Sequence, residues 1–204
     1  LPWGKRTRFH EEYGFSYSDA KLLASDKNWA DYADATITEL YDWLSSIDKS
    51  EKSSDELIQS NQNRLAKLCG GWFTSKLMGL LSERSIDIRL LKISPENFAE
   101  LIVLIYSEKI NSNNALKILS EMIDSGVDMD PTHIMEEKGY GQVSDEGEIT
   151  KIIEGVISSY PDQVAQFKAG KEPVIRFLIG MIMKATEGSA DPKLAEKLLR
   201  EKLK

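Results

Sequence analysis

The residues of this chain best suited to bind a charged ligand are the lysines and arginines near its C-terminal end. Residues 165–204 hold nine Lys or Arg against five Asp or Glu, a local net charge of +4, whereas the 204-residue chain carries −7. Basic side chains clustered on short helices favour a polyanionic partner. Because the total charge is acidic, we expect one basic face rather than a surface that binds nucleic acid everywhere.

The spacing within this segment predicts which cations act together. Positions 176, 180 and 184 are four apart, so Arg176, Gly180 and Lys184 share a helix face. A glycine between two cations lets a phosphate backbone approach closely. Two alternatives stay open: Gly180 permits helix packing, and Arg176 pairs with Glu172 one turn earlier. The opposite face is expected to be apolar, with Val174, Phe177, Leu178, Met181 and Ile182.

Further basic residues lie on both sides of this helix. Lys168 and Lys171 flank an expected turn at Gly170. A second stripe follows the terminal helix: Lys193, Lys197, Arg200, Lys202 and Lys204. A solvated helix explains this stripe about as well as ligand binding does. The predicted binding set is Lys168, Lys171, Arg176, Gly180, Lys184, Lys193, Lys197 and Arg200.

Residue patterns for covalent chemistry or metal binding are missing from the sequence. His10 and His133 are far apart, and neither has a His or Cys at metal-ligand spacing. Cys69, the single cysteine, lies on an apolar helical stripe, where a buried inert thiol is expected, and it excludes an intramolecular disulfide. We therefore expect a binding module with no catalytic residues and no metal. The sequence contains no run of 18 apolar residues, so it predicts no membrane-spanning helix.

Helix signals run through the whole chain, and no segment has a convincing strand pattern, so the predicted fold class is all-α. Ser16, Asp26 and Ser94 are placed as N-caps, and Gly126 as a helix stop. The polar stretch 48–60 is expected to be a solvated loop or insertion. Near the N-terminus, Lys5, Arg6 and Arg8 form a smaller basic cluster.

A change of character near residues 125–131 predicts two domains. Beyond it, four helix starts fall within about sixty residues, typical of a small bundle. They are Asp130-Pro131, Ser144-Asp145, Tyr160-Pro161 and Asp191-Pro192. We expect a multihelical domain over residues 1–130, net charge −6, followed by a small C-terminal helical bundle over residues 131–204, net charge −1.

Two segments resemble a known family. Residues 1–26, LPWGKRTRFHEEYGFSYSDAKLLASD, are similar to its pattern LP…R…R…YG(L)S..DA..L..D. Residues 136–149, EEKGYGQVSDEGEI, and 160–194, YPDQVAQFKAGKEPVIRFLIGMIMKATEGSADPKL, resemble its EEKGL.Q.SD, P..V..YK.GK and FL.GQVMK.T.G.A.P blocks. The family is the B subunit of the aspartyl/glutamyl-tRNA(Asn/Gln) amidotransferase (GatB), whose C-terminal part is shared with YqeY-like proteins. The chain departs from the family at Met181 (usually Gln), at Gly71 (usually Asn) and in the extra length of residues 48–60.

The resemblance implies that the complete enzyme, a carbon–nitrogen ligase with glutamine as amido donor, converts Glu-tRNA(Gln) or Asp-tRNA(Asn) to the amidated tRNA. It implies an amidase (A) subunit and a small C subunit as partners. It also implies that ATP and Mg²⁺ act in an N-terminal cradle domain that precedes the part matched here. Lys5, Arg6 and Arg8 would follow this cradle, so we expect them at the domain hinge, with a place near the tRNA acceptor stem as the alternative. The first residue is Leu1 rather than Met, so we expect a piece of a longer protein. The matching part would hold tRNA through phosphate and 2′-OH contacts.

One alternative to tRNA binding stays open: a non-catalytic, YqeY-like adaptor that binds other proteins. A long cradle-like segment encoded upstream of Leu1 would favour the amidotransferase, and a nearby start codon the adaptor. The expected location is the bacterial cytoplasm, with a mitochondrion or plastid as the alternative.

Overall fold

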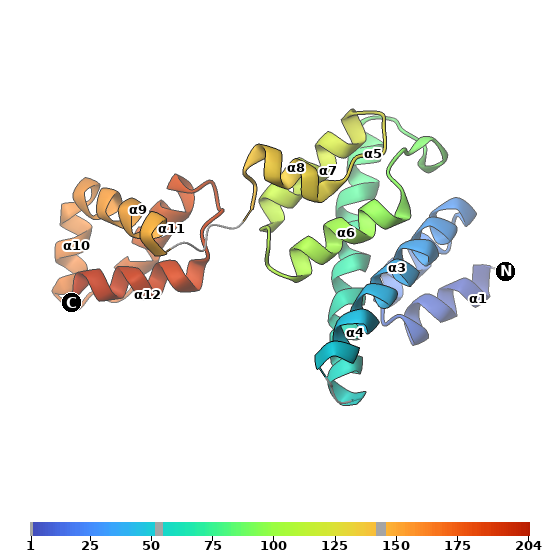
Figure 1. Ribbon diagram of the computed structural model, residues 1–204, viewed down its shortest axis with the longest axis horizontal. Helices are drawn as coiled ribbons and strands as arrows, with labels where there is room; N and C mark the ends of the chain where they lie inside the picture. Colours follow the sequence, from blue (N-terminus) through green and yellow to red (C-terminus); the bar gives the residue numbers. More distant parts are fainter. Residues whose placement is uncertain (1, 52–54, 142–145) are drawn as a thin grey trace. The chain divides into compact units, whose positions relative to one another are not determined.

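The chain, in a computed structural model that describes residues 2–51, 55–141 and 146–204, is all-α, as predicted (Figure 1). Within these ranges no segment forms a strand. The α-helices are α1 Pro2–Thr7, α2 Tyr17–Leu23, α3 Lys27–Glu51, α4 Asp55–Gly71, α5 Met78–Glu83, α6 Pro95–Tyr106, α7 Ser112–Asp124, α8 Pro131–Lys138, α9 Glu146–Ser159, α10 Pro161–Lys168, α11 Val174–Ala185 and α12 Pro192–Leu203. Two π-helices, η1 Arg8–Glu12 and η2 Trp72–Leu77, and a 3₁₀-helix, η3 Ile88–Leu90, complete the elements.

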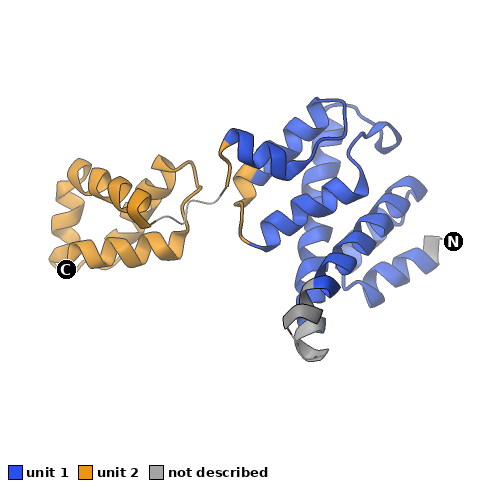
Figure 2. Cartoon of the chain, viewed as in Figure 1, with its two compact units in different colours: residues 1–107, 115–138 blue, residues 108–114, 139–204 orange. Residues whose placement is uncertain are grey.

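The helices form two compact units, shown in different colours in Figure 2. Unit 1 contains residues 1–107 and 115–138, and unit 2 contains residues 108–114 and 139–204. Helix α8 lies in unit 1, where it packs on α6, eight residues beyond the boundary expected from the sequence. The division into two independent domains stays a prediction.

The helix starts follow the capping signals of the sequence. Ser16, Asp26 and Ser94 each accept a backbone N–H from the first turn of the helix that follows, at 2.8–3.1 Å. Asp191 accepts the N–H of Lys193 at 2.8 Å and so caps α12. Each such cap satisfies a backbone donor that the helix itself leaves unpaired, and contributes about 1 kcal/mol. These four predicted starts are confirmed.

The other predicted starts lie before α8, α9 and α10. Asp130 accepts the N–H of His133 at 3.0 Å, and α8 begins at Pro131. Helix α10 begins at Pro161, directly after Tyr160, whose side chain does not cap it. The start predicted at residues 144–145 lies outside the described ranges. Proline at the first helical position therefore marks both of the starts that can be compared.

The core of unit 1 lies where α3 crosses α6. Phe98 of α6 and Phe73 of η2 have ring centroids 4.9 Å apart, and both side chains are fully buried. Tyr32 of α3 closes the cluster, with its ring 6.0 Å from that of Phe73. Its hydroxyl donates to the carbonyl of Ile93 at 3.0 Å, and burial raises the pKa of Tyr32 far above its ordinary value. This cluster ties three segments of unit 1 together.

The prediction of a loop over residues 48–60 is wrong for the residues of this stretch that the structure describes. Helix α3 continues to Glu51 and α4 begins at Asp55, while residues 52–54 lie outside the described ranges. Glu, Lys and Gln are good helix formers. Their polarity reflects solvent exposure, as at Gln59 and Ser60, rather than a break in the helix.

The two glycines in the apolar stripe of α4 have different surroundings. A Cβ at Gly70 would lie 3.5 Å from the ring of Phe15 and 3.6 Å from a carboxylate oxygen of Asp19, which are ordinary van der Waals distances. No atom lies within 4 Å of a Cβ at Gly71. The stripe then passes into the π-helix η2, where Thr74 donates to Asp19 at 2.7 Å. The sequence pattern does not predict this π-helix.

The thiol of Cys69 is expected to be inert in the folded protein. Its side chain is fully buried on α4, and burial raises its pKa well above the ordinary thiol value, which suppresses the reactive thiolate. A disulfide-exchange reagent such as DTNB should therefore release no chromophore from the native protein. It should release one equivalent after unfolding in urea. Rapid stoichiometric reaction without denaturant would contradict the buried placement.

Candidate nucleic-acid interface

The core of unit 2 determines which side of α11 faces solvent. Ile175, Leu178 and Ile182 are buried against α9 and α12. The side chains of Arg176 and Lys184, and the backbone at Gly180, are exposed. The spacing of four therefore separates a polar face from an apolar one, as the sequence predicts. A Cβ at Gly180 would have no atom within 4 Å, so tight helix packing does not account for this glycine.

Phe177 departs from the predicted apolar face. Its side chain is 43% exposed, and its ring meets that of Tyr160 edge to face with centroids 5.3 Å apart. Position 177 lies between the buried positions 175 and 178, yet α9 and α12 cover only part of the helix. The ring therefore lies at the rim of the core rather than inside it.

Lys168 is the last residue of α10, Lys171 follows the turn at Gly170, and both side chains are exposed. Gly170 has a φ of +93°, a left-handed conformation that favours glycine. The N–H of Lys171 donates back to the carbonyl of Gln166 at 3.1 Å. This closes α10 and leads the chain into α11, so the expected turn at Gly170 is confirmed.

The alternative that Glu172 neutralises Arg176 is not what the structure shows. Glu172 instead pairs with Arg200 at 3.2 Å, and Arg200 also contacts Glu196 at 3.0 Å. The hydrogen bonds that Arg200 donates, first to Glu196 and then to Glu172, raise the pKa of Arg200. Arg176 and Lys184 form no ion pair with another described residue. Of the predicted set, Arg200 therefore has the charge least available to a ligand.

The stripe on α12 divides in the same way. Lys193 and Lys197 are exposed and four apart, without a carboxylate partner among the described residues. Lys202 contacts Glu154 of α9 at 2.6 Å. The buried side of this helix carries Ala195, Leu198, Leu199 and Leu203.

An open groove lies between α9 and α11 on unit 2, with a volume of about 570 Å³. Its lining is largely apolar, with one cation and two hydroxyl groups. The lining residues are Ile152, Gly155, Val156, Ser159, Tyr160, Met181, Lys184 and Ala185. Lys184 therefore belongs both to the exposed face of α11 and to this groove.

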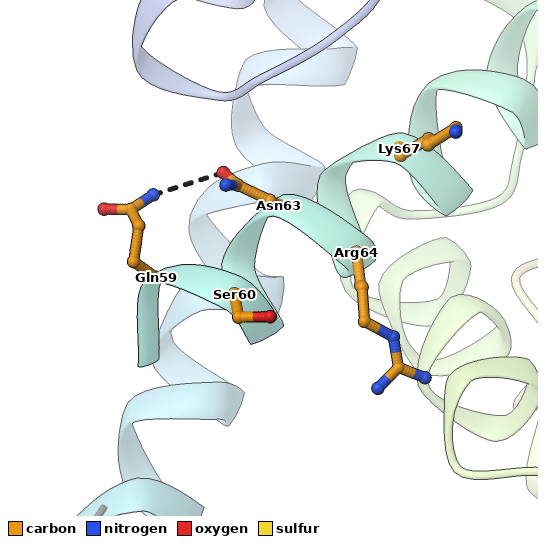
Figure 3. Close-up of a pocket in the computed structure, with 5 residues that line it drawn as sticks. All are labelled: Gln59, Ser60, Asn63, Arg64 and Lys67. Carbon is orange, nitrogen blue, oxygen red and sulfur yellow. Dashed lines mark hydrogen bonds between the residues drawn. The ribbon is translucent and has the colours of Figure 1, made fainter. Parts of the chain in front are cut away.

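Unit 1 carries a second polar surface, which the sequence pattern did not predict. Five side chains of α4 line an open pocket of about 520 Å³ (Figure 3): Gln59, Ser60, Asn63, Arg64 and Lys67. The amide of Gln59 donates to Asn63 at 3.1 Å, and the guanidinium of Arg64 lies 5.2 Å from the ring centroid of Tyr106. The spacing of four between the two amides was a usable signal. Gln59 falls within residues 48–60, for which the sequence predicts a loop, and a loop gives this spacing no meaning.

The N-terminal cations are largely balanced by acids of α3. Lys5 and Lys27 both donate hydrogen bonds to the carboxylate of Asp31. These bonds, with the one from Lys27 having the larger effect, lower the pKa of Asp31 to about 2. Arg8 pairs with Asp34 at 3.0 Å. This arrangement attaches α1 and η1 to α3. The hinge role expected for this cluster stays a prediction.

Groups suited to catalysis do not converge in the described residues. His10 Nδ1 lies 2.8 Å from the carbonyl oxygen of Phe15, and His133 lies 3.9 Å from Glu137 on the surface of α8. No set of three His, Cys, Asp or Glu side chains among residues 2–51, 55–141 and 146–204 is arranged to hold a metal ion. In the same ranges no helix is both long and apolar enough to cross a membrane.

Comparison with known proteins gives a consistent result. The profile of the GatB domain matches residues 53–203. The B subunit of the aspartyl/glutamyl-tRNA(Asn/Gln) amidotransferase from Prochlorococcus marinus (strain MIT 9312) is 36% identical over 203 residues, 100% of this chain and 36% of the relative. The proteins of the same name from Methanopyrus kandleri and Geobacillus thermodenitrificans are each 34% identical, over 99% and 100% of this chain and 39% and 37% of their own lengths. The chain thus spans little more than a third of the curated relatives it matches.

Proposed function

We propose, from the premise that this chain belongs to the GatB domain family, that it is the tRNA-binding region of an amidotransferase B subunit. In this proposal the complete enzyme converts Glu-tRNA(Gln) or Asp-tRNA(Asn) to Gln-tRNA(Gln) or Asn-tRNA(Asn). The present chain would bind the tRNA, and the reaction itself would take place elsewhere in the enzyme. The names of the relatives, which describe one component of an enzyme acting on tRNA, support the proposal.

The observation that carries the proposal is the exposed line of Arg176, Gly180 and Lys184 on α11. Arg176 and Lys184 have no acidic partner among the described residues. They can therefore bind phosphate without first breaking an ion pair within the protein. Gly180 leaves room for a sugar-phosphate chain between them. RNA helices are recognised mainly through their shape and backbone, which suits such a surface.

The other cations extend this surface to different degrees. Lys168 adds exposed charge at the end of α10 and Lys171 adds it before α11, while Lys193 and Lys197 add it on α12. Arg200, which is held by Glu172 and Glu196, would act more by orienting the helices than by touching RNA.

The proposal includes partners and cofactors outside this chain. An amidase (A) subunit and a small C subunit would complete a heterotrimer, and ATP with Mg²⁺ would act in a cradle domain of the full-length protein. The setting would be the bacterial cytoplasm.

A salt titration with unmodified tRNA tests this proposal. Each phosphate that a cation neutralises releases counterions, so with two to four phosphates bound we expect the slope of log affinity against log salt to be about −2 to −4. The measurement is fluorescence anisotropy of labelled tRNA with the 204-residue chain at several salt concentrations. Absence of binding, or an affinity that does not change with salt, would contradict the proposal.

A further inference from the structure

The groove between α9 and α11 has the composition of a site for a flat, partly apolar group. Ile152, Val156 and Met181 supply apolar surface. Gly155 contributes no side chain, and a Cβ there would meet no atom within 4 Å. The hydroxyl of Ser159 is already committed to the carbonyl of Gly155 at 2.8 Å. The groove is therefore open and mainly apolar on its α9 side.

One aromatic ring lines this groove and is in contact with a second ring beside it. Tyr160 lines it, and the ring of Phe177 stands edge to face against Tyr160 at 85°, with its side chain 43% exposed. An exposed phenylalanine is unusual on a small helical unit, whose other large apolar residues mostly face the core. Aromatic rings that remain in solvent beside a groove are surfaces on which nucleobases stack.

A positive charge lies at the same place. Lys184 lines the groove, and it has no acidic partner among the described residues. Arg176 lies on the same helix next to Phe177, also exposed and without such a partner. A nucleotide combines a flat base with an anionic phosphate, so the chemistry of this surface complements both of its parts.

We infer that the groove between α9 and α11 binds an unpaired or terminal nucleobase of the RNA, with Tyr160 and Phe177 as its aromatic border and Lys184 on the adjoining phosphate. The inference rests on the proposed tRNA binding and adds a base-contacting subsite to it. It separates two roles on α11: cations that hold the backbone, and an apolar groove that distinguishes RNA with accessible bases from continuous duplex.

Two variants test the subsite without removing a charge. Gly155→Leu fills the groove from α9, where the structure leaves space for a side chain, and Phe177→Ala removes the exposed ring. Ser158→Leu is the matched control, because it adds the same side chain at an exposed neighbouring position that does not line the groove. The probes are an unmodified tRNA transcript and a blunt RNA duplex with the same number of phosphates.

Each groove variant should bind tRNA about tenfold more weakly, the effect of losing one stacked base. Neither should change the slope of log affinity against log salt, because every phosphate-binding cation is retained. Binding of the duplex should be unchanged, and Ser158→Leu should behave as wild type. Thermal unfolding of each variant checks that unit 2 remains folded.

Three outcomes would overturn the inference. If the wild type binds tRNA and both groove variants bind it equally well, the groove does not hold a base, while the proposed function stands. If the variants lose affinity for tRNA and duplex alike, the groove does not select accessible bases. If the wild type binds neither RNA, the proposed function fails and the subsite fails with it.

Discussion

Replacing Phe98 with Ala is expected to lower the free energy of unfolding of unit 1 by about 3–5 kcal/mol. The side chain is fully buried, and its ring lies 4.9 Å from that of Phe73 and 6.2 Å from that of Tyr32. Truncation leaves a cavity at the crossing of α3 and α6, where the surrounding helices can relax only in part. Urea unfolding followed by tryptophan fluorescence measures the loss.

The tryptophans make this measurement specific. All four, Trp3, Trp29, Trp43 and Trp72, belong to unit 1, so their fluorescence reports on that unit. Leu90→Ala is the control, because Leu90 is 66% exposed and its truncation should change stability by less than about 0.5 kcal/mol. A loss below about 1 kcal/mol for Phe98→Ala would show that this cluster is not the core of unit 1.

The double change Lys171→Ala with Lys184→Ala is expected to weaken tRNA binding by about a hundredfold at about 50 mM salt and by about tenfold at about 200 mM. The reason is counterion release, since each phosphate-binding cation contributes more affinity when salt is dilute. Both lysines are exposed in unit 2, on the turn before α11 and in its last turn. Anisotropy titrations at the two salt concentrations measure the effect.

A matched pair of lysines in unit 1 controls for total charge. Lys76→Ala with Lys92→Ala removes the same two charges from exposed positions, outside the proposed binding surface. This control should leave tRNA affinity nearly unchanged, because neither lysine is among the cations proposed to bind phosphate and salt weakens their longer-range attraction. An equal loss in both double variants would mean that overall charge, not the surface of α11, governs binding.

Local signals in the sequence predicted the parts of the fold that depend on a few neighbouring residues. The caps at Ser94 and Asp191 and the turn at Gly170 are of this kind, because the paired backbone groups and their partners lie within five residues of each other. The π-helix η2 could not be predicted in this way. Its Thr74 donates a hydrogen bond to Asp19, a residue more than fifty positions away.

The same distinction holds for the candidate site. Helical periodicity placed Arg176, Gly180 and Lys184 on the exposed side of α11, because the buried positions repeat with the helix turn. Periodicity could not identify the partner of Glu172, which is Arg200, 28 residues away on another helix. Exposure of Phe177 likewise depends on how far α9 and α12 cover α11, which no local pattern encodes.

The polar surface of α4 was not predicted, because part of it falls within residues 48–60, which the sequence wrongly predicts to be a loop. Residues such as Ser60 and Asn63 are typical of loops when taken singly. On a helix, Gln59 and Asn63 lie one turn apart and meet. Once a stretch is expected to be a loop, spacing within it carries no information about shared faces.

The most direct test of the central claim, that cations on unit 2 hold an RNA backbone, is the difference in salt slope between the wild type and the Lys171→Ala, Lys184→Ala double variant. Because this variant lacks two cations that neutralise phosphate, the slope of log affinity against log salt should become shallower by about 2, while the Lys76→Ala, Lys92→Ala control keeps the slope of the wild type. Equal slopes for the wild type and the Lys171→Ala, Lys184→Ala variant would contradict the account.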